Sequence, residues 1–386
     1  MADLLISAPR VVPATAGSGV LEPGYVAVTG GEISAVGAGP PPGRVDVELA
    51  EGVLLPGFVD LQVNGYFGVE MATADADGWG LVAGRLPETG TTAFLPTYIT
   101  APVADLAAEL RCAVSLVPAL PRGSARVLGV HLEGPFIAPA RRGAHNARWI
   151  IPPSPEAVGE LLSAGPGLLR LVTLAPEAEG ALAAIEQLVG AGVMVSVGHS
   201  DATGQQVAAA AAAGARMVTH LFNAQRPLDH REPGVTGQAL ADHRLTSGLI
   251  ADFHHVSPEA CVIAFAAAPG RICLVTDAAA SAGMPAGRFR LGGEPIVLPS
   301  AEGAPPRRPD GTLAGSALRM DRAVANMVSA GVDLPTVVAA ATRVPADLIG
   351  RPGLGRLAPG AAADLAWLGS DLRTRGTWID GERVYP

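Results

Sequence analysis

The sequence predicts an α/β protein, a (β/α)8 TIM-type barrel with a small β-sandwich domain built from both chain termini. Three observations support this. Short β-branched runs alternate with longer Ala- and Leu-rich stretches through the middle of the chain. Both ends carry only strand and turn patterns. Hydrophobic residues make up 49% of the 386 residues and charged residues 16%, which indicates a large buried core.

The middle of the chain contains eight strand-like runs, each followed by a connecting segment. They are Phe58–Val63, Ala93–Pro96, Val127–Leu132, Leu169–Leu174, Val193–Gly198, Arg216–His220, Gly248–Asp252 and Ile272–Thr276. The clearest helices between them are Val103–Leu116, Ala181–Leu188, Gln205–Ala213 and Pro258–Ala268. Eight strand–helix units fit a (β/α)8 barrel, so we expect a catalytic barrel domain over residues 56–357.

The two ends resemble each other in pattern. Gly24–Val36 has the alternation of a hairpin with Gly30-Gly31 at its turn, and Asp380-Gly381 is a strong tight-turn signal near the C-terminus. Two strand-rich ends around a different middle predict one composite β-sandwich domain, formed by residues 1–55 and 358–386.

Composition excludes several classes of protein. The net charge is −9 and no basic run occurs, which argues against a nucleic-acid partner. No apolar run approaches the roughly 20 residues that span a bilayer, and the N-terminus lacks a signal peptide. Three distant cysteines, Cys112, Cys261 and Cys273, suit a reducing cytoplasm. The chain has no lysine, which excludes Schiff-base, P-loop and carbamate-bridged chemistry.

Side chains that carry chemistry follow the predicted strands. In such barrels the active site lies at the carboxyl ends of the strands. Five of the last six predicted strands end in a His, Glu or Asp; these ends contain Glu133, His199, His220, Asp252 to His255, and Asp277. A single histidine at such a place is more often structural, but five such ends on one rim favour a site.

Glu133, His199 and His220 would form a set of two imidazoles and one carboxylate, which suits a catalytic metal. Asp277 would then be the general base that faces the attacking water. A His-x-His pair after the first strand would indicate a second metal, but Gln62-Val63-Asn64 stands there, so we expect one divalent metal per chain. Zinc is favoured, and iron, cobalt or manganese also suit these ligands.

Ten segments in order give the chain a specific resemblance to a known family. They are Pro56–Gly65, Pro96–Thr100, His131–Phe136, Gly143–Asn146, Val172–Glu177, Gly198–Ser200, Thr219–Ala224, Arg231–Gly234, Leu274–Ala278 and Gly311–Ser316. With them the chain resembles the N-acetylglucosamine-6-phosphate deacetylase family of the amidohydrolase superfamily. The resemblance implies hydrolysis of the acetamide of a 6-phosphorylated amino sugar, with release of acetate, in amino-sugar recycling.

The resemblance also implies roles for further residues. His145 would polarise the acetamide carbonyl. The residues that it implies for substrate binding are Ala144, Asn223, Ala224, Arg231, His255, Leu313, Ala314, Gly315 and Ser316. Arg231 would reach the site of a neighbouring subunit, which implies a homodimer. Phe253 and Gln225 depart from the residues usual in the family, and they adjoin the proposed sugar and phosphate contacts.

The sequence leaves other functions open. The galactosamine epimer is the nearest alternative substrate, since the motifs do not reveal the orientation of a sugar hydroxyl. Another single-metal amidohydrolase is a further alternative, although D-aminoacylase-like and dihydroorotase-like enzymes lean on Cys or carbamylated Lys ligands that this chain lacks at the matching places. A barrel scaffold without catalysis is the remotest alternative, because every expected ligand is present.

Overall fold

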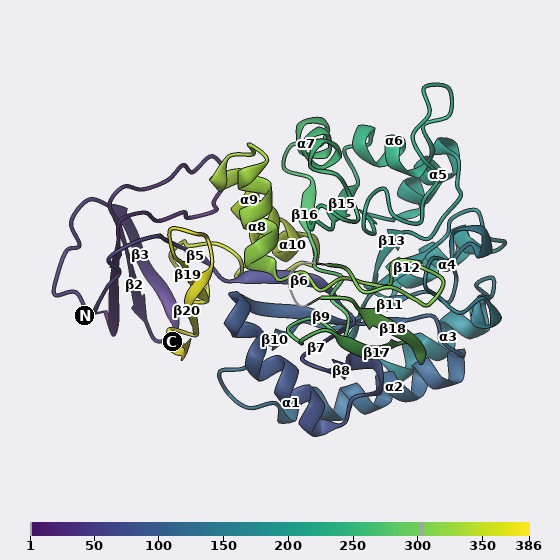
Figure 1. Ribbon diagram of the computed structural model, residues 1–386, viewed down its shortest axis with the longest axis horizontal. Coiled ribbons are helices and arrows are strands. Elements are labelled where there is room, and N and C mark those ends of the chain that lie inside the picture. Colours follow the sequence, from purple (N-terminus) through teal and green to yellow (C-terminus); the bar gives the residue numbers. More distant parts are fainter. Residues whose placement is uncertain (1, 301–303) are drawn as a thin grey trace.

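The middle of the chain forms a parallel barrel, as predicted. The computed structural model, which describes residues 2–300 and 304–386, places the barrel beside a small domain of two sheets (Figure 1). The barrel strands follow one another in space as they do in sequence. They are β6 (Phe58–Val63), β9 (Thr91–Ile99), β11 (Val130–Glu133), β12 (Leu169–Leu174), β13 (Met194–Val197), β14 (Met217–Val218), β15 (Thr246–Leu249) and β16 (Ile272–Leu274). The short β10 (Arg126–Val127) pairs with β9 just before β11 begins.

The barrel closes between its first and last strands without a regular ladder. The backbone N–H groups of Asn64 and Gly65 donate to the carbonyl of Ala278 at 2.8 and 3.0 Å. Beneath them, the buried carboxylate of Asp60 accepts hydrogen bonds from the backbone N–H and the hydroxyl of Thr276 at 3.2 and 2.5 Å. This closure brings the residues after β6 beside those after β16.

The helices surround the barrel, and the four that the sequence predicted are confirmed to within two residues. These are α2 (Val103–Leu116), α4 (Ala181–Gly190), α5 (Gly204–Ala213) and α7 (Pro258–Ala267). The sequence analysis did not identify α1 (Ala76–Arg85), α3 (Pro155–Ala164), α6 (Gly234–Ala241), α8 (Met320–Ser329), α9 (Leu334–Ala341) and α10 (Arg343–Leu348). Short 3-10 helices are η1 (Met71–Thr73), η2 (Leu86–Thr89), η3 (Val117–Ala119), η4 (Pro139–Arg141) and η5 (Ala147–Trp149).

Local sequence explains where helices begin. The Ser154 and Ser257 hydroxyls accept hydrogen bonds from the first turns of α3 and α7, and a proline follows each serine. At α5, Thr203 and Gln206 form a capping box. In the parts of the chain that the structure describes, no helix is both long and apolar enough to cross a membrane.

The two chain ends form the small domain, as predicted. One sheet has the order β3–β2–β1–β4, and the other has the order β21–β20–β19–β5. Their strands are β1 (Leu4–Ala8), β2 (Gly24–Thr29), β3 (Glu32–Ala38), β4 (Val47–Glu48), β5 (Val53–Pro56), β19 (Leu365–Leu368), β20 (Thr374–Ile379) and β21 (Glu382–Tyr385). Side chains from both sheets, including Ile6, Val26, Leu365 and Trp378, share one core. The domain limits at residues 55–56 and 357–358 stay a prediction, since β5 leads almost directly into β6.

A hairpin that the sequence analysis missed follows β16. It consists of β17 (Gly287–Leu291) and β18 (Glu294–Leu298), joined by Gly292-Gly293. A second short pair, β7 (Gly65–Tyr66) and β8 (Val69–Glu70), lies nearby (Figure 1). The backbone N–H of Gly292 donates to the Glu70 carboxylate and so fixes the hairpin tip to this pair. Gly-Gly is a recognised two-residue turn, so this signal was present in the sequence.

Asp321 links the barrel to the small domain, and its removal is expected to destabilise the protein. Its buried carboxylate accepts hydrogen bonds from Arg319 Nη2 at 2.9 Å and from the Thr374 backbone N–H at 3.1 Å. Replacement Asp321→Ala leaves the buried Thr374 N–H without its acceptor and Arg319 without its carboxylate partner, and we expect the free energy of unfolding to fall by about 3 kcal/mol. Urea denaturation followed by circular dichroism measures this.

The matched control is Asp371→Ala, which removes a solvent-exposed pair with Arg375. That change should cost less than about 1 kcal/mol. Equal losses in the two variants would contradict the role assigned to Asp321.

Candidate active site

Four of the predicted site residues lie at the carboxyl ends of the barrel strands. Glu133 is the last residue of β11, and His199, His220 and Asp277 follow β13, β14 and β16. His199, His220 and Asp277 have φ angles of 49°, 28° and 50°, in a region that non-glycine residues rarely adopt. Such conformations cost about 1–3 kcal/mol each and are typical of functional sites. Three of the residues that the sequence singled out therefore have strained backbone.

Three donor atoms converge in the manner of metal ligands. Glu133 Oε1 lies 2.8 Å from His220 Nε2 and 3.3 Å from His199 Nε2, and the two Nε2 atoms are 3.2 Å apart. Donors that share a tetrahedral metal at about 2.0–2.1 Å lie about 3.3 Å from one another. The three residues therefore have both the chemistry and the spacing to hold one divalent cation.

The carboxylate of Glu133 is held in its charged form by these neighbours. Burial alone would raise its pKa, but the neighbouring imidazoles of His199 and His220 hold the pKa well below its usual range. An anionic, buried oxygen facing two imidazoles is a strong site for a cation.

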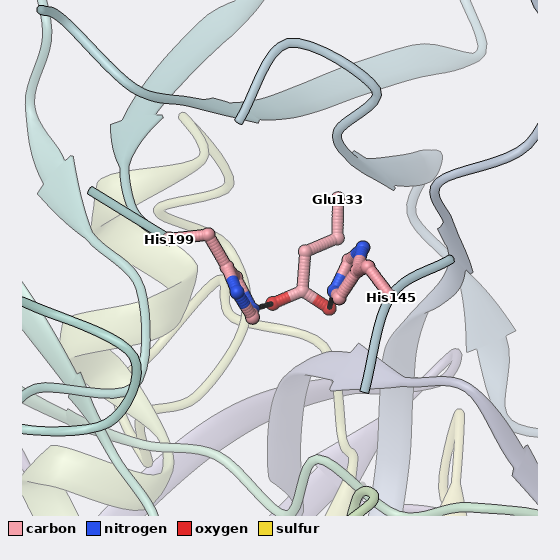
Figure 2. Close-up of side chains that lie close together, drawn as sticks. All are labelled: Glu133, His145 and His199. Atoms are coloured by element: carbon pink, nitrogen blue, oxygen red, sulfur yellow. Dashed lines mark ion pairs between the residues drawn. The ribbon is translucent and has the colours of Figure 1, made fainter. Parts of the chain in front are cut away.

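A second possible set of ligands contains His145 together with Glu133 and His199. Figure 2 shows His145 and His199 on opposite sides of Glu133. The Nε2 atom of His145 lies 3.8 Å from Glu133 Oε2, on the other carboxylate oxygen. Either Glu133, His199 and His220, or Glu133, His145 and His199, could therefore hold a metal. The partners of the remaining ring nitrogens decide between the two groupings.

His199 and His145 differ in where their ring protons lie. His199 Nδ1 is 2.8 Å from the Arg141 carbonyl, which can only accept, so Nδ1 carries the proton and Nε2 is free to bind a cation. His145 Nδ1 instead accepts the backbone N–H of Thr100 at 3.3 Å, so its proton lies on Nε2. Burial, followed by the neighbouring His199, holds the pKa of His145 well below its usual range, so the ring is neutral. His145 is therefore a hydrogen-bond donor, and the favoured ligands are Glu133, His199 and His220.

The side-chain amides of Gln62 and Asn64 occupy the positions at which two histidines would indicate a second metal. Gln62 Nε2 donates to Glu133 Oε1 and to Asp277 Oδ1, both at 3.1 Å, and Asn64 Nδ2 donates to Asp277 Oδ1 at 2.7 Å. Burial and the charge of Glu133 raise the pKa of Asp277 to about 6. Asp277 is therefore poised to exchange a proton near neutral pH.

These groups face one cavity of about 360 Å³. Predicted site residues that line it are Glu133, Ala144, His145, His199, His220, Asn223, Ala224, His255, Asp277, Leu313 and Gly315. His255 Nδ1 lies 2.7 Å from a carboxylate oxygen of Asp252, which fixes its ring and leaves Nε2 for a ligand. A larger hollow of about 1130 Å³ between the barrel and the small domain contains no histidine and no predicted site residue.

Three predicted substrate residues do not line this cavity. Arg231 lies in an exposed loop, where its backbone N–H bonds to Asp229. Ala314 is buried in an apolar cluster with Ile99 and Leu291. The hydroxyl of Ser316 donates to the Thr276 carbonyl at 2.5 Å. Ala314 and Ser316 thus support the cavity wall from behind.

The two unusual residues of the sequence also lie outside the cavity lining. Gln225 is buried, and its amide bonds to the backbone of Thr219 and Phe222 at 2.6 and 3.1 Å, so it braces the loop after β14. Phe253 has a φ angle of 64° and packs against the main core. Neither residue lines the cavity that contains Glu133 and Asp277.

Sequence reasoning missed several residues of the cavity wall. These are Ile99, Arg141, Ile250, Leu291 and Thr312. Leu291 comes from the hairpin β17–β18. Arg308, which follows the hairpin in sequence, donates a hydrogen bond to the carbonyl of the lining residue Ala144 at 2.8 Å. The Gly292-Gly293 turn would have indicated the hairpin, but no sequence signal shows which of its faces meets the cavity.

Comparison with known proteins decides the family. The model of the amidohydrolase family matches residues 53–384. The chain belongs to this family. An N-acetylgalactosamine-6-phosphate deacetylase of Escherichia coli O157:H7 is 39% identical over 86% of this chain and 87% of its own length. An N-acetylglucosamine-6-phosphate deacetylase of Bacillus subtilis (strain 168) is 37% identical over 80% of this chain and 78% of its own.

Solved structures agree with the sequence comparison. A mutant N-acetyl-D-glucosamine-6-phosphate deacetylase from Mycobacterium smegmatis, in complex with N-acetyl-D-glucosamine-6-phosphate, superposes with a TM-score of 0.93. It is 36% identical, and the match covers 99% of each chain. The barrel and the small domain of this amidohydrolase are therefore both shared with a deacetylase.

The proton arrangement predicts which histidines bind metal. Replacement of His199 or His220 by Ala should lower the affinity for the metal at least about tenfold, because each change removes a ligand. His145→Ala should leave metal content unchanged, because Nε2 of His145 carries a proton. Elemental analysis after dialysis against limiting metal measures this, and a His145→Ala protein that lost its metal would favour the second grouping.

Proposed function

We propose that this protein is a metal-dependent deacetylase that hydrolyses the acetamide of N-acetyl-D-glucosamine 6-phosphate to D-glucosamine 6-phosphate and acetate, in amino-sugar catabolism. The observation that carries the proposal is the single cavity in which a cation-binding triplet, a carboxyl group with a raised pKa and an imidazole donor face one another. Relatives with this fold carry the same activity in their names.

Glu133, His199 and His220 would hold one divalent cation, and zinc suits this donor set best, with iron, cobalt and manganese as alternatives. When bound, such a cation supplies Lewis acidity and makes hydroxide available at neutral pH. The amides of Gln62 and Asn64, which bond to Glu133 and Asp277, support a site for one cation rather than two.

The chain's own residues would move the protons. Asp277 accepts a proton from the attacking water and then gives it to the nitrogen of the departing amine. A C–O bond forms as the C–N bond breaks, and the products are acetate and the free amine. The Nε2–H of His145 donates to the acetamide oxygen as negative charge develops there.

The sugar and its phosphate would bind in the same cavity. Of the residues that line it, Asn223, the Ala224 backbone and His255 would contact the sugar and phosphate, and Ala144, Leu313 and Gly315 would contact the acetyl group. With a net charge of −9, the protein can attract a phosphate only through local donors. We propose a homodimer in which Arg231, exposed and outside its own chain's cavity, completes the phosphate site of the partner.

The galactosamine epimer is the second candidate substrate, favoured by the 39% identity to an N-acetylgalactosamine-6-phosphate deacetylase. We also propose a cytoplasmic location, because the three cysteines are free and the cytoplasm keeps thiols reduced.

Acetate release tests the proposed function. The purified protein is incubated with N-acetylglucosamine 6-phosphate, with its galactosamine epimer, and with unphosphorylated N-acetylglucosamine. We expect turnover that depends on the phosphate and is fastest with the first compound. Preference for the epimer would favour the second candidate, and no acetate from either sugar phosphate would contradict both.

Asp277→Asn tests the proton carrier. The amide keeps the size of the side chain but cannot carry the proton, so kcat should fall by about 10²- to 10⁴-fold. Metal content should stay unchanged, because Asp277 is not among the three ligands. Near-normal turnover by a variant that still holds its metal would contradict this role.

A further inference from the structure

Thr100 is a close polar partner of His145. It follows β9 directly, and both side chains are buried, with 2% and 3% of their surface exposed. The Thr100 hydroxyl lies 2.7 Å from His145 Nδ1, and its backbone N–H donates to the same nitrogen at 3.3 Å. One residue thus presents two donors to one ring nitrogen of a proposed catalytic histidine.

These contacts determine where the imidazole proton lies. A backbone N–H can only donate, so at 3.3 Å it favours the tautomer in which Nδ1 presents its lone pair. Since that nitrogen has no proton to give, the hydroxyl at 2.7 Å also acts as a donor to it. The ring proton is therefore on Nε2, the atom that faces Glu133 Oε2 at 3.8 Å and the cavity.

Gly134 makes room for this arrangement. A Cβ atom at Gly134 would lie 2.2 Å from the Thr100 hydroxyl oxygen, and the φ angle of +87° also favours glycine. The same hydroxyl oxygen is 3.4 Å from the Glu133 carbonyl. Pro96–Thr100, a segment of the resemblance without an assigned role, thus meets the Gly134 turn behind His145.

We propose that Thr100 is a positioning residue, which fixes the tautomer of His145 so that Nε2–H points at the substrate's acetamide oxygen. The proposal rests on the proposed function for the identity of that oxygen. It also explains how three imidazoles around one carboxylate divide into two ligands and one donor. With the other tautomer, His145 would present a lone pair to the cation instead of a proton to the substrate.

Thr100→Val removes the hydroxyl and keeps the shape of the side chain. We expect kcat for acetate release to fall about five- to tenfold, with KM within about twofold and metal content unchanged, because one hydrogen bond to the catalytic donor is lost. Thr100→Ser, which keeps the hydroxyl, should recover most of the rate.

The matched control is Thr377→Val, at a buried threonine whose hydroxyl donates to the Pro87 carbonyl at 2.7 Å, away from the cavity. It should leave kcat unchanged. Equal losses in Thr377→Val and Thr100→Val, or no recovery in Thr100→Ser, would contradict the proposal.

A double-variant cycle tests whether Thr100 acts through His145. In a His145→Ala protein, adding Thr100→Val should change kcat by less than about twofold, because the group that Thr100 positions is absent. A further five- to tenfold loss in that background would show that Thr100 acts by another route, and would overturn the proposal.

Nitrogen NMR of protein labelled with ¹⁵N-histidine and loaded with zinc reads the tautomer directly. The chain has eight histidines, and the signal that disappears in the His145→Ala variant is assigned to His145. We expect Nε2–H in the wild type and a new Nδ1–H population in Thr100→Val. A wild-type Nδ1–H form, or an unchanged Nε2–H population in Thr100→Val, would overturn the proposal. This measurement needs no turnover, so it separates failure of the proposal from failure of the proposed function.

Discussion

The buried carboxylate of Glu133 is the group on which the rest of the site depends. An anion that is 3% exposed at the mouth of a barrel needs positive or hydrogen-bonding neighbours, because burial of an unpaired charge costs many kcal/mol. His199, His220 and Gln62 supply them from three other strand ends. The parallel barrel makes this convergence feasible, since it brings the carboxyl ends of all its strands to one rim.

One residue type performs two tasks around that carboxylate. His199 and His145 are both buried imidazoles near Glu133, yet their Nδ1 atoms have opposite partners, a carbonyl that accepts and an N–H that donates. Those backbone groups, from Arg141 and Thr100, make one ring suited to a cation and the other suited to a substrate oxygen. The division of roles is therefore set by the backbone around the site as well as by the site residues.

Much of this architecture could be predicted from sequence, for a physical reason. Strand periodicity located all eight barrel strands, and residues just after a parallel strand must meet at one rim, so Glu133, His199, His220 and Asp277 could be grouped from sequence. Contacts made by loops could not be predicted in this way. Leu291 reaches the cavity from a hairpin, Gln225 turns into its own loop, and the partner of His145 depends on backbone direction at Thr100.

The most direct test of the central claim is a titration of activity against bound metal. Chelator-treated protein is reloaded stepwise with zinc, and acetate release from N-acetylglucosamine 6-phosphate is plotted against metal bound per chain. The account predicts activity that rises linearly and reaches its plateau at about one metal per chain. Full activity without metal, or a plateau that requires two metals per chain, would contradict it.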